Sequence, residues 1–112
     1  MYKQILRPLL FKFDPEIIHE ITVEWLSRAG KFSPVLALLK KIYGNRTADL
    51  PIEVMGIQFP APVGLAAGLD KDARCISALS SFGFGHLELG TVTPKPQPGN
   101  PAPRLFRIPE YR

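Results

Sequence analysis

The chain has 112 residues, of which 46% are hydrophobic and 21% are charged, and this composition is typical of a globular protein. Its length suffices for one small domain, because a complete (β/α)8 barrel takes about 250 residues and a dinucleotide-binding fold about 150. The formal net charge of +4 is weak evidence for binding to nucleic acid or to an anionic membrane surface.

Apolar runs and cysteine usage narrow the class of protein further. The longest unbroken apolar run, Val35–Leu39, is far shorter than the roughly 20 residues that a membrane-spanning helix needs. Lys12 and Asp14 interrupt the apolar stretch near the N-terminus and no small-residue cleavage site follows, so Met1 is expected to begin the mature protein. The single cysteine, Cys75, predicts a buried, inert thiol in a reducing compartment, with no disulfide and no metal cluster.

The first predicted element is a short amphipathic helix near the N-terminus. Its apolar stripe is flanked by the cations Lys3 and Arg7, as in helices that lie on a surface. Pro8 is expected to kink this helix or to split it after Arg7. The stripe consists of Tyr2, Ile5, Leu6, Leu9 and Phe13.

A second helix is expected to begin with Asp14 as its N-cap and Pro15 in its first position. Glu24 can pair with Arg28 on its exposed side, and Gly30 suits its C-terminal cap. The predicted inner face consists of Ile18, Ile21, Trp25 and Ala29.

A third helix is expected to start at Ser33 and Pro34 and to end at Gly44. Its apolar stripe consists of Val35, Leu38, Leu39 and Ile42. Three such short helices have a small mutual interface, so apolar surface stays uncovered. Residues 1–44 are thus predicted to form a helical extension, followed by a linker at residues 45–51.

From residue 52 the pattern changes to that of an α/β protein. Ile52–Val54 and Ile57–Phe59, joined by Met55 and Gly56, predict a β-hairpin. Val63–Ala66 has the composition of a fully buried parallel strand.

A helix near Ala73–Phe82 and a strand at His86–Leu89 would complete a βαβ unit with a right-handed crossover. The proline-rich stretch Lys95–Pro103 is expected to be an extended loop, after which Arg104–Ile108 can form a further strand. Residues 52–112 therefore look like the beginning of a larger parallel α/β fold.

Both predicted parallel strands end in residues that can bind a ligand, because ligands of α/β folds bind beyond the carboxyl ends of such strands. Ala66, Ala67 and Gly68 would let a flat ligand approach the backbone, and Lys71 offers a cation. From these residues alone, a tight turn with a solvated charge cluster is the favoured interpretation. The hydroxyl of Thr91 can bond a phosphate or a ring edge, although β-branched residues also simply fill strand ends.

Three motifs and their spacing carry a specific resemblance. They are DPE-x-x-HE at Asp14–Glu20, GLAAGLDKD at Gly64–Asp72, and GFG-x-x-E-x-GTVTP-x-PQPGNP-x-PR-x-FR at Gly83–Arg107. Together they resemble dihydroorotate dehydrogenase, over nearly the whole chain. The helical extension is similar to that of the membrane-associated, quinone-dependent class, because the cytosolic class lacks it.

The resemblance implies the start of an FMN-binding TIM (β/α)8 barrel, incomplete in this chain and preceded by the helical extension. The family oxidises dihydroorotate to orotate in pyrimidine (UMP) biosynthesis and passes the electrons to a quinone. Lys71 would also meet the substrate, since an ammonium beside the flavin stabilises negative charge there and can pair with a carboxylate. The implied FMN contacts, mostly through backbone groups, are Ala67, Gly68, Leu69, Asp70, Lys71 and Thr91.

For the helical extension, the resemblance implies a quinone entrance that lies peripherally on a membrane. His19 and Arg107 would sit near the quinone head group, whereas the residues alone suggest a partly exposed helix histidine and an ordinary strand arginine. The simplest location is the cytoplasmic face of a bacterial cell membrane. Ordinary structural roles are expected for His86 (polar group at a strand edge), Arg74 (solvated helix charge) and Trp25 (core aromatic).

Three alternatives remain open. The main one is a non-catalytic amphipathic membrane-surface module, which predicts liposome binding that needs no flavin and survives Lys71→Ala. A nucleic-acid-binding protein is disfavoured, because the basic residues are not interleaved with exposed aromatic residues and no recognition motif occurs. Another FMN barrel enzyme would leave the helical extension and the PQPGNP-x-PR loop unexplained.

We predict that these 112 residues alone show no turnover and weak or absent FMN binding. The family's catalytic base, a serine in this class, and its phosphate-binding strands are expected beyond Arg112, so no residue here is assigned as the base. The measurement is flavin content and dihydroorotate oxidation of the purified 112-residue chain. Yellow protein with one FMN per chain would contradict the prediction.

Overall fold

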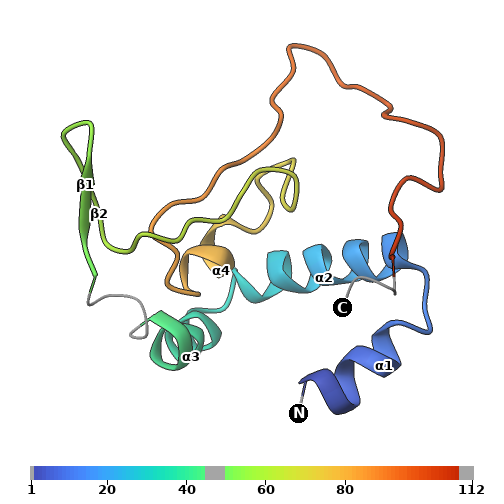
Figure 1. Ribbon diagram of the computed structural model, residues 1–112, viewed down its shortest axis with the longest axis horizontal. Helices are drawn as coiled ribbons and strands as arrows, with labels where there is room; N and C mark the ends of the chain where they lie inside the picture. The colour runs from blue at the N-terminus through green and yellow to red at the C-terminus, as the bar shows by residue number, and fades with distance from the viewer. Residues whose placement is uncertain (1, 45–49, 109–112) are drawn as a thin grey trace. The chain divides into compact units, whose positions relative to one another are not determined.

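The computed structural model describes residues 2–44 and 50–108 (Figure 1). The chain forms two compact units, one of residues 1–22 and 95–112 and the other of residues 23–94. Residues 45–49 of the predicted linker lie outside the described residues. In chain order the elements are a π-helical segment η1 (Tyr2–Leu6), helices α1 (Arg7–Leu10), α2 (Pro15–Ala29) and α3 (Ser33–Tyr43), strands β1 (Ile52–Val54) and β2 (Ile57–Phe59), and helix α4 (Ile76–Ser80).

The N-terminal segment stays helical through Pro8, so the predicted break after Arg7 is wrong. η1 ends at Leu6 and α1 begins at Arg7, which moves the change in hydrogen bonding one residue earlier. Pro8 then lies in the first turn of α1, a position that proline often occupies. Neither η1 nor α1 contains a buried residue.

Asp14 caps the N-terminus of α2, as predicted. One carboxylate oxygen, Oδ1, accepts hydrogen bonds from the backbone N–H groups of Glu16, at 2.8 Å, and Ile17, at 3.2 Å. Pro15 occupies the first helical position. The cap therefore satisfies two of the four N–H groups that a helix leaves without an intrahelical partner.

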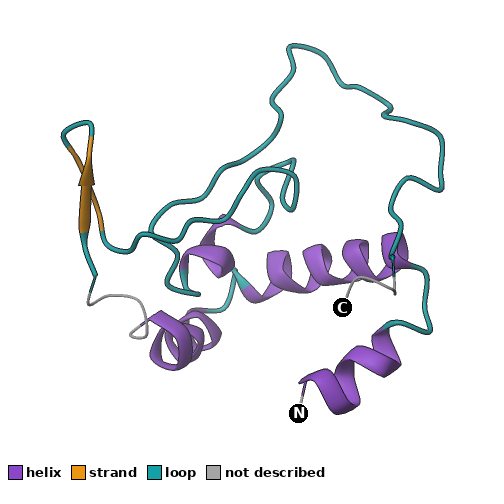
Figure 2. Ribbon diagram, viewed as in Figure 1, coloured by secondary structure: helices purple, strands orange, loops and turns teal. Residues whose placement is uncertain are grey.

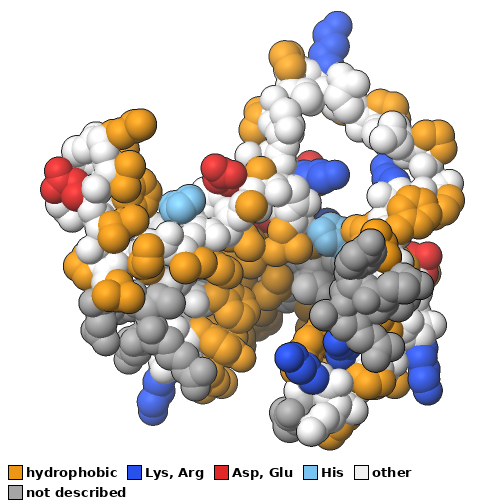
Figure 3. All heavy atoms as spheres, viewed as in Figure 1, with side chains coloured by type: hydrophobic (Ala, Val, Ile, Leu, Met, Phe, Trp, Pro, Cys, Tyr) orange, Lys and Arg blue, Asp and Glu red, His pale blue; other side chains and the backbone are white. Residues whose placement is uncertain are grey.

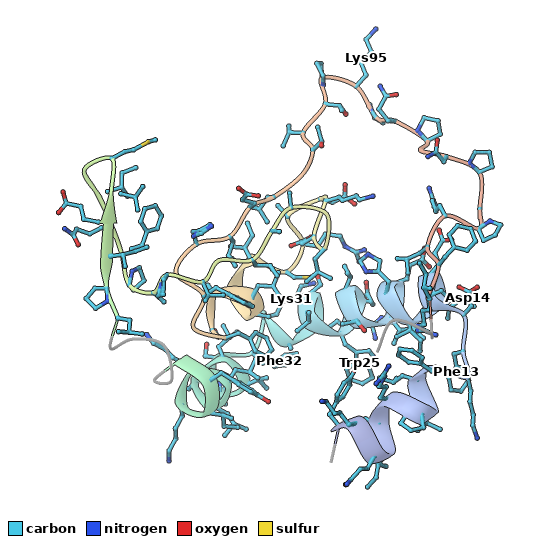
Figure 4. The ribbon with its side chains drawn as sticks, viewed as in Figure 1. Phe13, Asp14, Trp25, Lys31, Phe32 and Lys95 are labelled. Atoms are coloured by element: carbon cyan, nitrogen blue, oxygen red, sulfur yellow. The ribbon has the colours of Figure 1, made fainter. Side chains whose placement is uncertain are left out.

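The buried face of α2 differs from the predicted one. Val23 is its buried residue, with 7% of its surface exposed, and Leu26 packs beside it against Cys75 and Leu79. Trp25 is 68% exposed, so the expectation of a core aromatic is wrong (Figure 4). The small core therefore meets α2 on the side of Val23 and Leu26. Of the predicted inner face, Ile21 is also exposed, whereas Ile18 and Ala29 are partly buried.

Helix α3 has the predicted bounds, with Pro34 in its first turn and Gly44 at its C-terminal cap. Its last residue, Tyr43, contacts Phe82, with ring centroids 5.1 Å apart. No residue of α3 is buried. Exposed hydrophobic side chains are widespread on the molecular surface (Figure 3), and on this helix they include Val35, Leu38 and Ile42.

Strands β1 and β2 form the predicted antiparallel hairpin (Figure 2). Ile52 pairs with Phe59 and Val54 with Ile57. Met55 and Gly56 connect the strands with φ angles of 53° and 76°. Positive φ at both central residues is typical of the type I′ turn, one of the two common turns of two-residue hairpins.

The predicted βαβ unit is present in outline, with one parallel bridge between Leu65 and Leu87 in place of two full strands. The N–H of Leu65 donates to the carbonyl of His86, at 3.0 Å, and the N–H of Glu88 donates to the carbonyl of Leu65, at 2.9 Å. Val63 is exposed, so the expectation of a fully buried strand is wrong. Burial on both faces needs covering layers that the described residues do not supply.

Between the bridged segments, α4 is shorter than the predicted helix near Ala73–Phe82. Ala78 and Leu79 are its buried residues. The core cluster consists of buried Val23, Cys75 and Leu79 with partly buried Leu26, Leu65, Leu69 and Leu87.

The segment after the bridge contains no helix and no strand as far as Ile108 (Figure 2). This confirms the extended loop at Lys95–Pro103 and contradicts the strand at Arg104–Ile108, because no described segment pairs with these residues. The described residues therefore hold a two-stranded sheet and a parallel bridge, and no closed barrel. None of the described helices is long and apolar enough to cross a membrane.

Candidate functional site

The candidate site follows the first bridged segment, where small residues leave the backbone open. Ala66 and Ala67 are exposed, and Gly68 has a φ of +105°. L side chains rarely adopt this φ, so glycine is required there by the backbone conformation. Apart from Gly68 and its two neighbours in the chain, no atom of the described residues lies within 4 Å of the position that a Cβ at Gly68 would take.

Asp70 and Lys71, two adjacent residues of this loop, differ sharply in environment. Asp70 is 2% exposed, and its carboxylate accepts hydrogen bonds from the backbone N–H groups of Arg74, at 2.8 Å, and Cys75, at 2.6 Å. Lys71 is exposed, and no ion pair of the described residues includes its ammonium. The ammonium of Lys71 is therefore open to solvent, while the adjacent Asp70 is held in place by hydrogen bonds.

The parallel bridge brings a second segment to the same edge. Because Leu65 and Leu87 run parallel, the residues that follow each of them leave the bridge in the same direction. Glu88 contacts the first segment, since its Oε2 accepts a hydrogen bond from the N–H of Ala67 at 3.4 Å. Thr91, four residues beyond Leu87, is exposed and follows a buried Gly90.

Two glycines permit the close approach of the bridged segments. A Cβ at Gly64 would overlap the imidazole of His86, and a Cβ at Gly85 would overlap the carbonyl group of Ala61. His86 also contacts Phe59 edge to face, with ring centroids 5.5 Å apart. His86 is thus an exposed polar residue beside the bridge, in keeping with the structural role expected of it.

Cys75 lies at the junction of this loop and the core. Its Sγ donates to the carbonyl oxygen of Val23 at 3.1 Å, and it is a buried, free cysteine, as predicted. Burial, followed by the nearby Asp70 carboxylate, raises the pKa of the thiol. A raised pKa disfavours the reactive thiolate, which agrees with the expectation of an inert side chain.

Arg74 is exposed, as expected, but it precedes α4 and is not part of that helix. It forms an ion pair with Glu24 of α2. Glu24 also pairs with Arg28, with 2.8 Å between its Oε1 and the Nε of the arginine, as the spacing predicted. Hydrogen bonding from Arg28, with a smaller contribution from Arg74, lowers the pKa of the Glu24 carboxyl group.

The other compact unit, residues 1–22 and 95–112, contains a separate cavity of about 400 Å³. Arg107 lines it, and its Nη1 donates to the carbonyl oxygen of Phe13 at 2.7 Å. The guanidinium lies 4.6 Å from the centroid of the Phe11 ring, a cation–π distance. The lining residues are Phe11, Phe13, Asp14, Pro15, Pro103, Leu105, Phe106 and Arg107.

His19 is partly exposed on α2 and is not among the residues that line this cavity. Of the two predicted quinone contacts, only Arg107 therefore lines it. It is no strand arginine, because its segment forms no strand. The carbonyl of Phe13 and the ring of Phe11 hold Arg107 in place. Apart from the presence of aromatic residues near position 11, nothing in the sequence predicted either contact.

A second arginine ties the same segment to α2. Arg104 Nε lies 2.6 Å from Glu16 Oε1, and Arg104 Nη1 donates to the carbonyl of Pro98 at 3.4 Å. The hydrogen bond from Arg104 lowers the pKa of the Glu16 carboxyl group, and the same bond raises the pKa of Arg104. The sequence analysis did not single out this pair, because 88 residues separate its members.

Comparison with known proteins identifies the same family that the three sequence motifs resemble. The sequence model of the family described as dihydroorotate dehydrogenase matches residues 49–111, which is more than half of the chain. The chain belongs to the dihydroorotate dehydrogenase family. This confirms the family that the motifs at Asp14–Glu20, Gly64–Asp72 and Gly83–Arg107 predicted.

Individual relatives agree with this assignment. The chain is 53% identical over 110 residues to a dihydroorotate dehydrogenase (quinone) of Methylococcus capsulatus, covering 98% of this chain and 31% of that protein. It is 54% identical to the protein of the same name from Christiangramia forsetii, covering 98% of this chain and 32% of that protein. The chain thus spans about a third of the length of the curated relatives it matches.

A solved structure is also similar. The dihydroorotate dehydrogenase of Eimeria tenella, crystallised in complex with ferulenol, superimposes with a TM-score of 0.68 at 40% identity. The match covers 87% of this chain and 24% of the other. The arrangement of helices and bridged segments is therefore one that a dihydroorotate dehydrogenase adopts.

The Glu16–Arg104 pair predicts a pH-dependent contribution to stability. Because folding lowers the pKa of Glu16, the contribution is present above the usual carboxyl pKa of about 4.3 and is lost as the pH falls through the lowered value. We expect Glu16→Gln to lower the melting temperature at pH 6, with the difference shrinking below about pH 4.

The control is Glu53→Gln, which changes the same type of group in β1, in the other compact unit. Thermal unfolding of the three proteins between pH 3 and pH 7 measures the effect. A melting-temperature difference for Glu16→Gln that stays constant over this range would contradict it.

Proposed function

We propose that the protein carrying this chain is a quinone-dependent dihydroorotate dehydrogenase, which oxidises dihydroorotate to orotate in pyrimidine biosynthesis. The observation that carries the proposal is the open backbone at Ala66–Gly68, next to the exposed ammonium of Lys71 at the edge of the parallel bridge. Family membership and the names of the quinone-type relatives support the reaction.

The residues at this edge fit the flat ring system of FMN. The small side chains from Ala66 to Gly68 leave N–H and C=O groups that can bond a ring edge. The open space beside Gly68 suits a planar group in close contact with the backbone. The proposed contacts are Ala67, Gly68, Leu69, Asp70, Lys71 and Thr91, with Leu69 also packed against the core.

Lys71 has two tasks in this proposal. Its ammonium stabilises the negative charge that develops on the ring as the substrate is oxidised, and it pairs with the carboxylate of dihydroorotate. FMN, when bound, supplies the acceptor for the hydride of the substrate. No residue of this chain is assigned as the base that removes the substrate proton.

The cavity beside Arg107 is the proposed place for the quinone head group. A guanidinium held by one hydrogen bond and one aromatic ring keeps further N–H groups with which to bond a quinone carbonyl. Apolar lining residues such as Leu105 and Phe106 suit the rest of the ring. His19 remains a proposed neighbour of the head group, on the motif resemblance alone.

A peripheral position on the cytoplasmic face of a bacterial membrane is part of the proposal. The support is the exposed apolar surface of η1, α1 and α3, which Lys3, Arg7 and Lys40 flank. Such surfaces bind at the interface of a bilayer, with apolar side chains buried and cations near the headgroups.

We expect Lys71→Ala to lower kcat/KM for dihydroorotate by at least about tenfold and to weaken FMN binding, because a charge-assisted contact to ring and substrate is lost. Steady-state kinetics and flavin content of the full-length protein measure both effects. Lys31→Ala removes the ammonium of another exposed lysine and is expected to leave both unchanged. Wild-type kinetics and flavin content for Lys71→Ala would overturn the assignment.

A separate prediction concerns the quinone. Arg107→Ala is expected to raise KM for a soluble quinone by about tenfold, while KM for dihydroorotate stays unchanged, because the arginine bonds only the acceptor. Arg28→Ala, which removes a surface arginine of α2, is the control. Equal changes in both KM values, or none in that for quinone, would argue against the quinone assignment of this cavity.

A further inference from the structure

Asp70 is a buried carboxylate in a loop that is otherwise exposed. Both of its oxygens are used: Oδ1 accepts from the N–H of Arg74 and Oδ2 from the N–H of Cys75. Burying a charged group is unfavourable unless hydrogen bonds compensate, and the two N–H groups do so here. The carboxylate therefore points toward the backbone that follows it, and its partners lie four and five residues further along the chain.

These two bonds close a short ring of backbone around Lys71. The ring begins at Asp70 and ends at Cys75, whose thiol bonds the carbonyl of Val23 inside the core. Within the ring, Ala73 has a φ of +57°, which is unusual for a residue with a side chain. Such a conformation persists only where surrounding contacts hold it, and the Asp70 carboxylate supplies them.

An amide could not replace this carboxylate. Asparagine at position 70 would offer one acceptor oxygen and one NH2 group, whereas the loop presents two N–H donors. One of the two backbone N–H groups would then face another donor in a buried place. The chemistry of the site thus requires two acceptor oxygens.

We propose that Asp70 is a positioning residue, whose side chain fixes the loop that carries Lys71 and does not itself contact the flavin. The inference rests on the proposed function, since it assigns Asp70 a task in the same cofactor site. The backbone of Asp70 stays among the proposed flavin contacts, while its side chain acts through Lys71.

The test is a double-mutant cycle on FMN affinity. Apoprotein of the full-length enzyme is titrated with FMN, and quenching of flavin fluorescence gives Kd for wild type, Asp70→Asn, Lys71→Ala and the double variant. We expect each single variant to weaken binding by about tenfold, and the double variant to bind no more weakly than Lys71→Ala alone. Asp72→Asn, which removes an exposed carboxylate two residues away, is the matched control and is expected to bind like wild type.

A compensating substitution tests whether the conformation of the loop is what the Asp70 side chain holds. Ala73→Gly removes the unfavourable φ, so adding it to Asp70→Asn is expected to restore part of the FMN affinity. If Asp70→Asn alone does not fold, the pair Asp70→Asn/Ala73→Gly takes its place in the cycle. Absence of any restoration would count against the positioning role.

The outcomes separate this inference from the function it rests on. Wild-type affinity for Asp70→Asn, or losses that multiply in the double variant, would overturn the positioning role while Lys71 keeps its place at the flavin. Unchanged affinity for Lys71→Ala would overturn the proposed contact itself and, with it, any action of Asp70 through Lys71.

Discussion

The carboxylate of Asp70 is the constraint on which the candidate flavin site depends. It joins an exposed, glycine-containing loop to Cys75, and Cys75 joins that loop to α2 through the carbonyl of Val23. The core at this junction is small, and among the described residues its buried cluster consists of Val23, Cys75 and Leu79. Apolar packing against so small a core cannot fix the conformation of this loop, so hydrogen bonds must do much of it.

The excess of exposed apolar surface is the second physical feature of the chain. Large hydrophobic side chains are exposed to solvent on η1, α1, α2 and α3 and on the β1–β2 hairpin. Exposed apolar surface of this extent marks a place where something else binds. The parallel bridge between Leu65 and Leu87 also exposes surface that another element could cover. A single pair of parallel segments leaves both of its faces and both of its edges open to solvent.

The sequence predicted well those features of the structure that depend on neighbouring residues. The Asp14 cap, the bounds of α3 and the two-residue hairpin turn follow from a few adjacent residues, and the structure confirms each of them. Predictions of burial failed where they depended on which face of an element meets a distant one. Trp25 was expected inside because its spacing fitted an apolar stripe, whereas contact with Cys75 and Leu79 selects the Val23 side of α2.

The same limit applies to the candidate sites. The motif at Gly64–Asp72 predicted which residues to examine, but nothing in it distinguishes the buried Asp70 from the exposed Asp72. That distinction depends on the position of two N–H groups at Arg74 and Cys75, which exists only once the loop is folded. Likewise the partners of Arg107 come from a segment more than 90 residues away.

Lys71 and Arg107 show two ways of holding a cation ready for a ligand. Arg107 is fixed through its own side chain, by the Phe13 carbonyl and the Phe11 ring, and its planar group has donors to spare after these contacts. An ammonium used in this way would lose a larger share of its donors and of its solvation. Lys71 is instead held through the loop that the Asp70 carboxylate orders, which leaves all three of its N–H groups for the proposed ring and substrate. A carboxylate that bonded the Lys71 side chain directly would neutralise the charge the site needs, whereas Asp70 orders the loop and leaves that charge exposed.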